Sequence, residues 1–224
     1  MARHGPEDAS DFERQRQRMV EGQLKPRGIR DERVLRAMAQ VPRERFVPEG
    51  MRLEAYADRP LPIGEGQTIS QPYMVAAMLE ALACNSGDVA LEVGAGSGYQ
   101  AALLAELCRQ VYAVEIVEKL AERARQRLAD LGYENAEVVV GDGTQGLPEH
   151  APYDRIIVAA GAPRVPEPLS DQLADGGRLV IPVGSRMTQR LLIVERYGEE
   201  IVERKGMPCV FVPLVGRHGW RPGT

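Results

Sequence analysis

The sequence has few cysteines, and they are not arranged like metal ligands or a disulfide framework. The chain has three, at positions 84, 108 and 209, each within an apolar segment and none in a CxxC or Cys/His cluster. An odd number in such surroundings argues against a zinc site and against disulfide staples, and it predicts buried, reduced thiols. We therefore expect no metal site.

Long apolar runs and an excess of basic charge are absent as well. No segment approaches the roughly 18 apolar residues that span a bilayer, and MARHGPEDASDF (1–12) contains no apolar signal-peptide core. The net charge is −4, and the locally basic stretch 14–36 has acidic residues interleaved, which favours a solvated helix face over a nucleic-acid-binding arm. We expect a cytoplasmic protein that binds neither membranes nor nucleic acids. No heptad repeat stands out, and we expect a monomer.

The order of apolar patterns predicts an α/β fold with a doubly wound, mostly parallel sheet. From about residue 71, strand-like apolar runs alternate with helical patterns, and apolar runs of this kind are typical of a parallel sheet covered on both faces. Strands are expected at 89–95, 110–116, 136–142, 154–160 and 178–184, and helices at 71–84, 99–108, 117–132 and 167–174.

The N-terminal part predicts a helical cap on this sheet. SDFE (10–13) has the form of a capping box, so a helix is expected from there to about Leu24. A second helix is expected at 31–41, and residues 43–66, rich in proline and glycine, look irregular.

The C-terminal part predicts an antiparallel addition to one edge of the sheet. Residues 189–198 and 199–216 look like two strands joined through Gly198. We expect residues 1–12 to form a flexible tail and residues 13–224 to form a single domain.

A glycine-rich loop carries the strongest chemical signal, in LEVGAGSGYQ (91–100). Gly94, Gly96 and Gly98, with Ser97 between the last two, follow a strand and open a helix, so a ligand can approach the backbone closely. The spacing is GxGxG, and Tyr99 stands where a GxGxxG dinucleotide fingerprint has its third glycine. The loop therefore fits a nicotinamide dinucleotide poorly.

Three acids near the carboxyl ends of successive strands indicate which cofactor the loop binds. Glu92 would repel a diphosphate but suits the ammonium of S-adenosylmethionine. Glu115, 17 residues after Gly98, is placed to accept hydrogen bonds from ribose hydroxyls, and Asp142 with Gly143 is placed to read an adenine edge. Each acid alone could be an ordinary turn or cap. As an ordered set they favour an S-adenosylmethionine site.

The sequence disfavours two common classes of methyl acceptor, planar amines and cytosine. The segment after the fourth strand, 156–166, lacks the Asn/Asp-Pro-Pro-aromatic run common in enzymes that methylate planar amines, and Cys209 lies too far along to be a cytosine-methylating nucleophile. A carboxylate is ionised at pH 7 and needs no general base. In GEGQTISQP (64–72), Ser70 is expected to be the N-cap of the next helix, with Pro72 in its first turn, and a helix N-terminus also suits a carboxylate.

Several segments together carry a resemblance to a known family: MVEGQL, VPRERFVP, AYADRPLPIGEGQTISQP, LEVGAGSGYQ, VVVGDG, YDRIIVAAGAP, GGRLVIPVG and FVPLVG. From about residue 14 onward, the chain resembles the protein-L-isoaspartate O-methyltransferases. TISQP is the specific part of the resemblance, because many methyltransferases share the glycine loop. The resemblance implies a class I, Rossmann-like methyltransferase fold.

The resemblance also implies an activity and a set of site residues. The family transfers a methyl group from S-adenosylmethionine to the free α-carboxylate of L-isoaspartyl residues in age-damaged proteins and peptides, which primes succinimide formation and return to aspartate. Ser70 matches the active-site serine, with Thr68 and Ala160 expected to contact substrate. The cofactor positions are Gln71, Glu92, Gly94, Gly96, Ser97, Gly98, Glu115, Asp142 and Gly143. His218 and Trp220 are expected in a surface tail.

Three other functions remain open on the residues alone. One is methylation of RNA or a small molecule on the same fold, which the acidic balance and the missing polar-Pro-Pro element disfavour for RNA. Another is a module that binds S-adenosylmethionine or a nicotinamide without catalysis. The third, a structural interaction domain, leaves the strand-end acids and the glycine loop unexplained.

Overall fold

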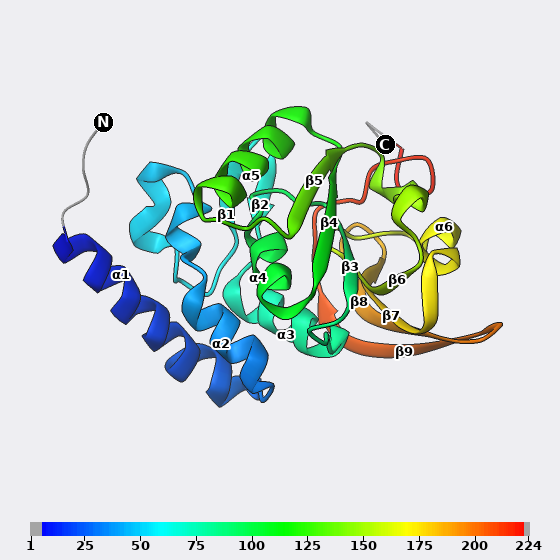
Figure 1. The fold of residues 1–224 in the computed structure, drawn as a ribbon, viewed down its shortest axis with the longest axis horizontal. Coiled ribbons are helices and arrows are strands. Elements are labelled where there is room, and N and C mark those ends of the chain that lie inside the picture. The colour runs from blue at the N-terminus through cyan, green and yellow to red at the C-terminus, as the bar shows by residue number, and fades with distance from the viewer. Residues whose placement is uncertain (1–5, 222–224) are drawn as a thin grey trace.

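A seven-stranded sheet organises the computed structural model, which describes residues 6–221 (Figure 1). Across the sheet the strands are β5 (Ala136–Val140), β4 (Gln110–Glu115), β3 (Val89–Val93), β6 (Tyr153–Val158), β7 (Leu173–Gly184), β8 (Gln189–Tyr197) and β9 (Glu200–Cys209). The first five are parallel, and β8 and β9 are antiparallel additions at one edge. The predicted fold class is confirmed.

The centre of the sheet is a topological switch point. β3 pairs with β4 on one side and with β6 on the other, so the chain builds outward in both directions from this pair. Loops that leave β3 and β6 therefore diverge, and ligands of open α/β sheets bind in the crevice between them, at the carboxyl ends of the strands.

The helices are α1 (Pro6–Met19), α2 (Glu32–Gln40), α3 (Pro72–Leu82), α4 (Tyr99–Leu107), α5 (Glu118–Asp130) and α6 (Glu167–Asp171). Apolar side chains of the first five share one buried cluster with Ala90 and Val111, so they cover one face of the sheet. A second cluster, which includes Leu91, Val93 and Leu169 of α6, covers the other face. Successive strand residues thus point to opposite layers, as the pleat requires.

The N-terminal helix begins earlier than the sequence suggests. α1 starts at Pro6, so Ser10 lies inside the helix and is not its cap. Residues 6–12 of the expected tail are therefore helical, and residues 1–5 lie outside the described residues. Proline is favoured in the first helical turn, and this signal competes with the capping box at Ser10. Helical structure continues to Leu24 through a π-helical turn, Val20–Leu24. The expected second helix is confirmed, with Asp31 as its N-cap.

The segment expected to be irregular, 43–66, contains ordered structure. It holds two 3₁₀ helices, Arg43–Arg45 and Glu49–Glu54, and the strand β1 (Leu61–Gly64), which pairs antiparallel with β2 (Gln67–Ile69). The tight turn between these strands has positive φ at three successive residues, which explains why two of them are glycines.

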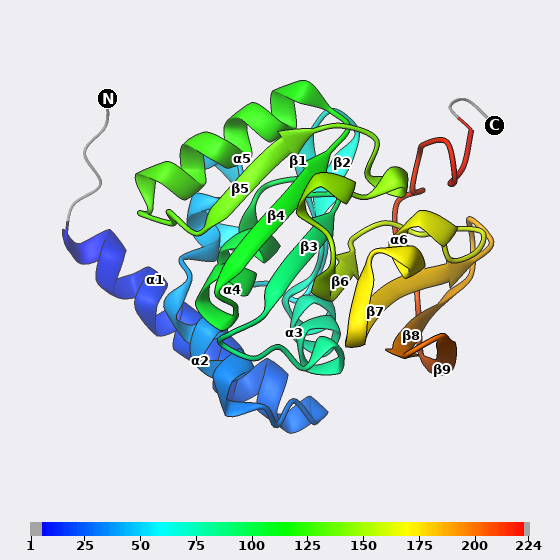
Figure 2. The same ribbon diagram turned by 45° about the vertical axis from the view of Figure 1, so that its right-hand side comes forward.

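The predicted edge hairpin is confirmed in β8 and β9, but its second strand is shorter than expected. β9 ends at Cys209, and the chain then leaves the sheet and runs back beside β6, where the Gly161 amide donates to the Val212 carbonyl (2.8 Å) and the Leu214 amide donates to the Gly161 carbonyl (2.8 Å). Residues 210–216 are therefore not part of a strand in the sheet. Figure 2 shows this segment, in red, at the same end of the sheet as the β1–β2 hairpin and far from α1.

Candidate active site

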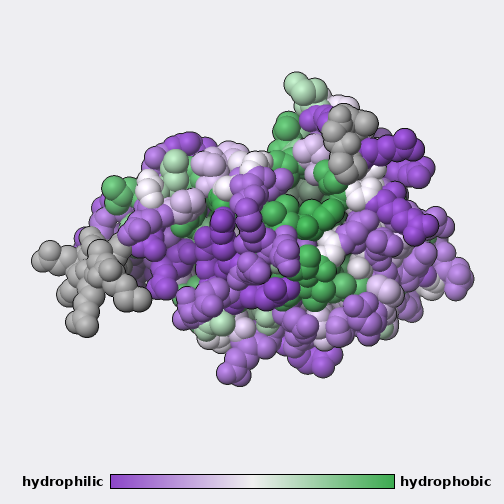
Figure 3. Space-filling view, turned by 90° about the horizontal axis from the view of Figure 1, so that it is seen from above, coloured by the Kyte–Doolittle hydropathy of each residue, from purple (hydrophilic) through white to green (hydrophobic). Residues whose placement is uncertain are grey.

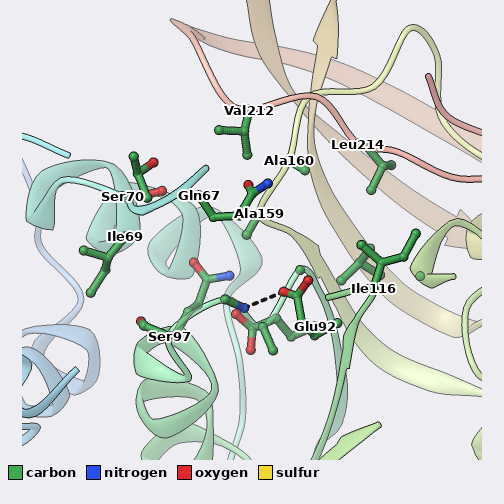
Figure 4. A pocket seen from close by; sticks show the side chains of 18 of the residues that line it. Gln67, Ile69, Ser70, Glu92, Ser97, Ile116, Ala159, Ala160, Val212 and Leu214 are labelled. Carbon is green, nitrogen blue, oxygen red and sulfur yellow. Dashed lines mark hydrogen bonds between the residues drawn. The ribbon is translucent and has the colours of Figure 1, made fainter. Parts of the chain in front are cut away.

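A pocket opens at the carboxyl ends of the central strands. Its walls come from β2 and the residues after it, the glycine loop, the ends of β3, β4 and β6, and the C-terminal segment. Figure 3 looks onto this end of the molecule and shows apolar residues gathered between hydrophilic surfaces. Figure 4 shows Ser70 and Gln67 on one side of the pocket and Glu92 on the other, with Val212 and Leu214 on a further wall.

The glycine loop has the backbone shape that its sequence predicts. Gly94, Gly96 and Gly98 have φ values of 92°, 53° and 87°, a region that side chains rarely allow. A Cβ on Gly98 would lie 3.2 Å from the Cβ of Ala124, so this glycine also permits α4 to approach α5. The loop, together with Ser97, lines the pocket.

Glu92 is a buried carboxylate without a hydrogen-bond partner among the described residues. It is 0% exposed, and both its oxygens are unpaired. Burial raises the pKa of Glu92 well above its ordinary value, the nearby Glu115 raises it further, and Gln100 opposes the shift. Unpaired buried carboxylates are rare because desolvation is costly, so this one marks a place for a cationic group.

Glu115 supports the glycine loop from the end of β4. Its two oxygens accept hydrogen bonds from the Gly96 amide (2.8 Å) and the Val117 amide (2.9 Å). A carboxylate has about four acceptor sites, so two remain for hydroxyl groups of a ligand. Since Glu115 also lines the pocket, it can hold the loop and a ligand at once.

Asp142 and Gly143, which follow β5, differ in their surroundings. Gly143 lines the pocket, and a Cβ there would lie 2.6 Å from Val93 Cγ1. Asp142 is not among the lining residues. Its carboxylate accepts hydrogen bonds from the amides of Thr144 (3.0 Å) and Arg217 (2.8 Å), so in this structure it holds the C-terminal segment.

The Ser70 loop reaches the pocket, but not as a helix cap. α3 begins at Pro72 with Gln71 in the N-cap position, and no side chain caps it, so the prediction that Ser70 is the N-cap was wrong. Proline at the first helical position pushes the preceding residue into an extended conformation, which moves the cap to Gln71. Ser70 and Thr68 line the pocket; Gln71 does not.

The C-terminal segment is the part of the site that sequence reasoning missed. Val212, Leu214 and Val215 line the pocket. Ala160, which the sequence analysis did name, lines it as well. Trp220, expected in a surface tail, is half-buried, and its indole N–H donates to the Gly161 carbonyl (2.9 Å). The His218 amide donates to the Thr144 hydroxyl (3.1 Å). The segment FVPLVG (211–216), which carries part of the family resemblance, and the lone tryptophan were the available signals.

The cysteines are free thiols in the core of the protein. All three cysteines are buried and unpaired, as predicted. Within residues 6–221, no group of three His, Cys, Asp or Glu side chains is placed to hold a metal ion, and no helix has the length and apolarity to span a membrane.

Comparison with known proteins identifies the family. Residues 14–219 match the model of the protein-L-isoaspartate(D-aspartate) O-methyltransferase family. The chain is 56% identical over 215 residues to the protein-L-isoaspartate O-methyltransferase of Methanoculleus marisnigri, covering 96% of this chain and 97% of the relative. It is 59% identical over 210 residues to protein-L-isoaspartate O-methyltransferase 2 of Pelobacter propionicus, covering 93% of each. The chain belongs to this family.

Solved structures agree with the assignment. A protein-L-isoaspartate O-methyltransferase superimposes with a TM-score of 0.82 at 31% identity, covering 91% of this chain and 67% of the other. A candidate isoaspartate methyltransferase from Plasmodium falciparum, solved with S-adenosyl-L-homocysteine, gives 0.77 at 29% identity, covering 89% of this chain and 98% of the other. The family decides between the open alternatives: the cofactor is S-adenosylmethionine, and the enzyme is a protein-repair methyltransferase acting on isoaspartyl residues.

Proposed function

We propose that this chain methylates the free α-carboxylate of L-isoaspartyl residues through Ser70, which orients the carboxylate opposite the cofactor. The observation that carries this proposal is the arrangement of the pocket, in which the Ser70 loop faces the glycine loop and the unpaired Glu92. One wall thus offers a hydroxyl to an anion, and the other offers a carboxylate to a cation.

The cofactor half of the site fits the chemistry of S-adenosylmethionine. Glu92 would hold its ammonium, Glu115 would hold the ribose hydroxyls with its two remaining acceptor sites, and the backbone at Gly143 would contact the adenine. The glycine loop and Ser97 would contribute backbone and hydroxyl groups to the same half of the site. Asp142 supports this half from outside by fixing the C-terminal wall, and Gln71 supports Ser70 from the start of α3.

The substrate half of the site is open and partly apolar. Thr68 is exposed and Ala160 is nearly buried on the other side, and both line the pocket. An isoaspartyl segment in an extended form would lie between them, contacted through its backbone. Recognition of the backbone explains why a repair enzyme can accept damaged sites in many sequences.

The reaction needs positioning more than acid–base chemistry. When bound, S-adenosylmethionine supplies a methyl group on a positively charged sulfur. The substrate carboxylate is already ionised and acts as the nucleophile, so the protein has to hold it in line and exclude water. Ser70 would donate a hydrogen bond to one carboxylate oxygen and leave the other free to act as the nucleophile. The ester carbonyl is a better electrophile than a carboxylate, because methoxide leaves more readily than oxide. Succinimide closure, in which the adjacent backbone nitrogen attacks that carbonyl and methanol departs, follows without the enzyme.

Replacing Ser70 tests this assignment. In Ser70→Ala we expect methylation of an isoaspartyl peptide to fall by about 10- to 150-fold, because one hydrogen bond to a charged group contributes about 1.5–3 kcal/mol, while S-adenosylhomocysteine binds with unchanged affinity. Ser86→Ala, at an exposed serine beyond α3, is the matched control. A Ser70→Ala protein that binds cofactor and keeps full activity would remove Ser70 from the mechanism.

We propose further that the enzyme works as a monomer in the cytoplasm. Three buried, unpaired thiols suit a reducing compartment. The exposed edge strand β9 carries interleaved charges, Glu200, Glu203, Arg204 and Lys205, which disfavour pairing with a second sheet.

A further inference from the structure

Arg43 is a completely buried cation that the reaction scheme leaves unexplained. It is the largest side chain with no solvent exposure in the described core. Arginine is almost never fully buried unless it is paired. No carboxylate of the described residues forms an ion pair with Arg43, and its Nη1 has no hydrogen-bond partner. Because burying an unpaired charge is costly, we looked for a role of this side chain in its contacts.

The partners of Arg43 are backbone carbonyls from two separate segments. Its Nε donates to the Ala55 carbonyl (2.7 Å), and its Nη2 donates to the Ser70 carbonyl (2.7 Å). Both bonds are short, as charge-assisted bonds are. The guanidinium therefore joins the end of the second 3₁₀ helix to the loop that carries Ser70.

Arg43 also contacts the cofactor side of the pocket. Its guanidinium carbon lies 4.9 Å from the centre of the Tyr99 ring, within the range of a cation–π interaction. Tyr99 directly follows Gly98, begins α4, lines the pocket and is 1% exposed. One rigid, planar side chain thus contacts both the Ser70 loop and the first residue after the glycine loop.

We propose that Arg43 is a positioning residue, which fixes the distance between the Ser70 loop and the glycine loop and so aligns the substrate carboxylate with the methyl donor. The inference rests on the proposed role of Ser70. Arg43 binds the carbonyl of Ser70 and not its hydroxyl, so it sets where the loop lies and leaves the hydroxyl for substrate. A displacement of about 1 Å can lower a rate about 100-fold.

Three variants test the proposal. Arg43→Met removes charge and donors while keeping a long stem, Arg43→Lys keeps the charge but cannot bridge two carbonyls as a planar fork does, and Arg45→Met, at an exposed neighbour, is the matched control. Activity on an isoaspartyl peptide is expressed per cofactor-binding site, counted by titration with S-adenosylhomocysteine. This normalisation removes any effect of lost folded protein.

We expect kcat per site to fall about 10- to 100-fold in Arg43→Met and by an intermediate factor in Arg43→Lys. The peptide KM and the Kd for S-adenosylhomocysteine should stay within about threefold of the wild-type values, because the variant changes the alignment of the bound carboxylate and not its binding. Unchanged kcat per site in Arg43→Met would overturn the proposal. If that variant does not fold, unchanged kcat in Arg43→Lys would do so.

A double variant separates this proposal from the role of Ser70. If Arg43 acts through the Ser70 loop, Arg43→Met lowers kcat less in a Ser70→Ala background than in the wild type. If Ser70→Ala is itself impaired and Arg43→Met lowers kcat by the same factor in both backgrounds, the proposed role of Arg43 is overturned. Full activity of Ser70→Ala with a slow Arg43→Met would instead refute the proposed role of the hydroxyl and support a loop held through its backbone.

Discussion

Replacing Glu92 by glutamine should weaken cofactor binding and stabilise the empty protein at the same time. The substitution keeps the shape of the side chain and removes a buried charge that has no partner among the described residues. A hydrogen bond to a charged group contributes about 1.5–3 kcal/mol, and 1.36 kcal/mol is a factor of ten. The Kd for S-adenosylhomocysteine should therefore rise about 10- to 150-fold.

The effect on stability depends on pH in a defined direction. Burial raises the pKa of Glu92 above its ordinary value of 4.5, so the folded protein binds this proton more tightly than the unfolded chain. The free energy of unfolding of the wild type therefore decreases as pH rises above about 4.5 towards the folded pKa, by at most about 1.4 kcal/mol per pH unit for one group. Glu92→Gln lacks this decrease. The difference in the free energy of unfolding between Glu92→Gln and the wild type should therefore grow with pH in favour of the variant.

Two assays on the cofactor-free protein test the reasoning. Calorimetric titration with S-adenosylhomocysteine gives the Kd, and urea denaturation at pH 5 and pH 8 gives the pH dependence of stability. Glu137→Gln, on the exposed side of β5, is the matched control and should change neither quantity. An unchanged Kd together with equal stability changes for both variants would refute the assignment of Glu92 to the ammonium.

Two further predictions concern the C-terminal segment and the thiols. Asp142→Asn should loosen the segment it anchors and shift the emission of Trp220, the chain's single tryptophan, to longer wavelength, whereas Asp171→Asn in α6 should not. Unchanged emission in Asp142→Asn would show that the segment holds without this carboxylate. The three thiols should react with a thiol reagent only after denaturation, because all are buried. Burial raises the pKa of Cys209 to about 11. The pKa of Cys108 is raised mainly by a hydrogen bond with Cys84 and, next, by burial. Rapid labelling of the native protein would contradict this prediction.

Short-range patterns predicted the sheet and its glycine loop. The alternation of strand and helix signals from β3 to β7 is local, and parallel strands place all their carboxyl ends at one edge. The sequence therefore suffices to place Glu92, Glu115 and Gly143 in one pocket, which all three line. The three loop glycines follow from the same local geometry, since each has positive φ.

Contacts between distant parts of the chain were beyond such reasoning. Asp142 bonds the amide of Arg217, 75 residues away, so no local rule could show that its carboxylate was already engaged. The return of residues 210–216 to the pocket depends on the same kind of contact, with Gly161. The β1–β2 hairpin was missed because its strands are only four and three residues long.

One error could have been avoided from the sequence. Gln71-Pro72 places proline at the first helical position, which makes Gln71 the N-cap and frees Ser70 for the pocket. The capping box at Ser10 predicted the wrong start for the first helix for a related reason, because α1 begins at Pro6. In both cases proline decides where the helix begins.

The most direct test of the assigned activity compares two synthetic peptides of identical sequence, one containing L-isoaspartate and the other L-aspartate, with methyl-labelled S-adenosylmethionine. The proposed function predicts base-labile label on the isoaspartyl peptide alone, because mild base hydrolyses methyl esters and only the isoaspartyl residue has a free α-carboxylate. Label on both peptides, or on neither while the cofactor still binds, would contradict it.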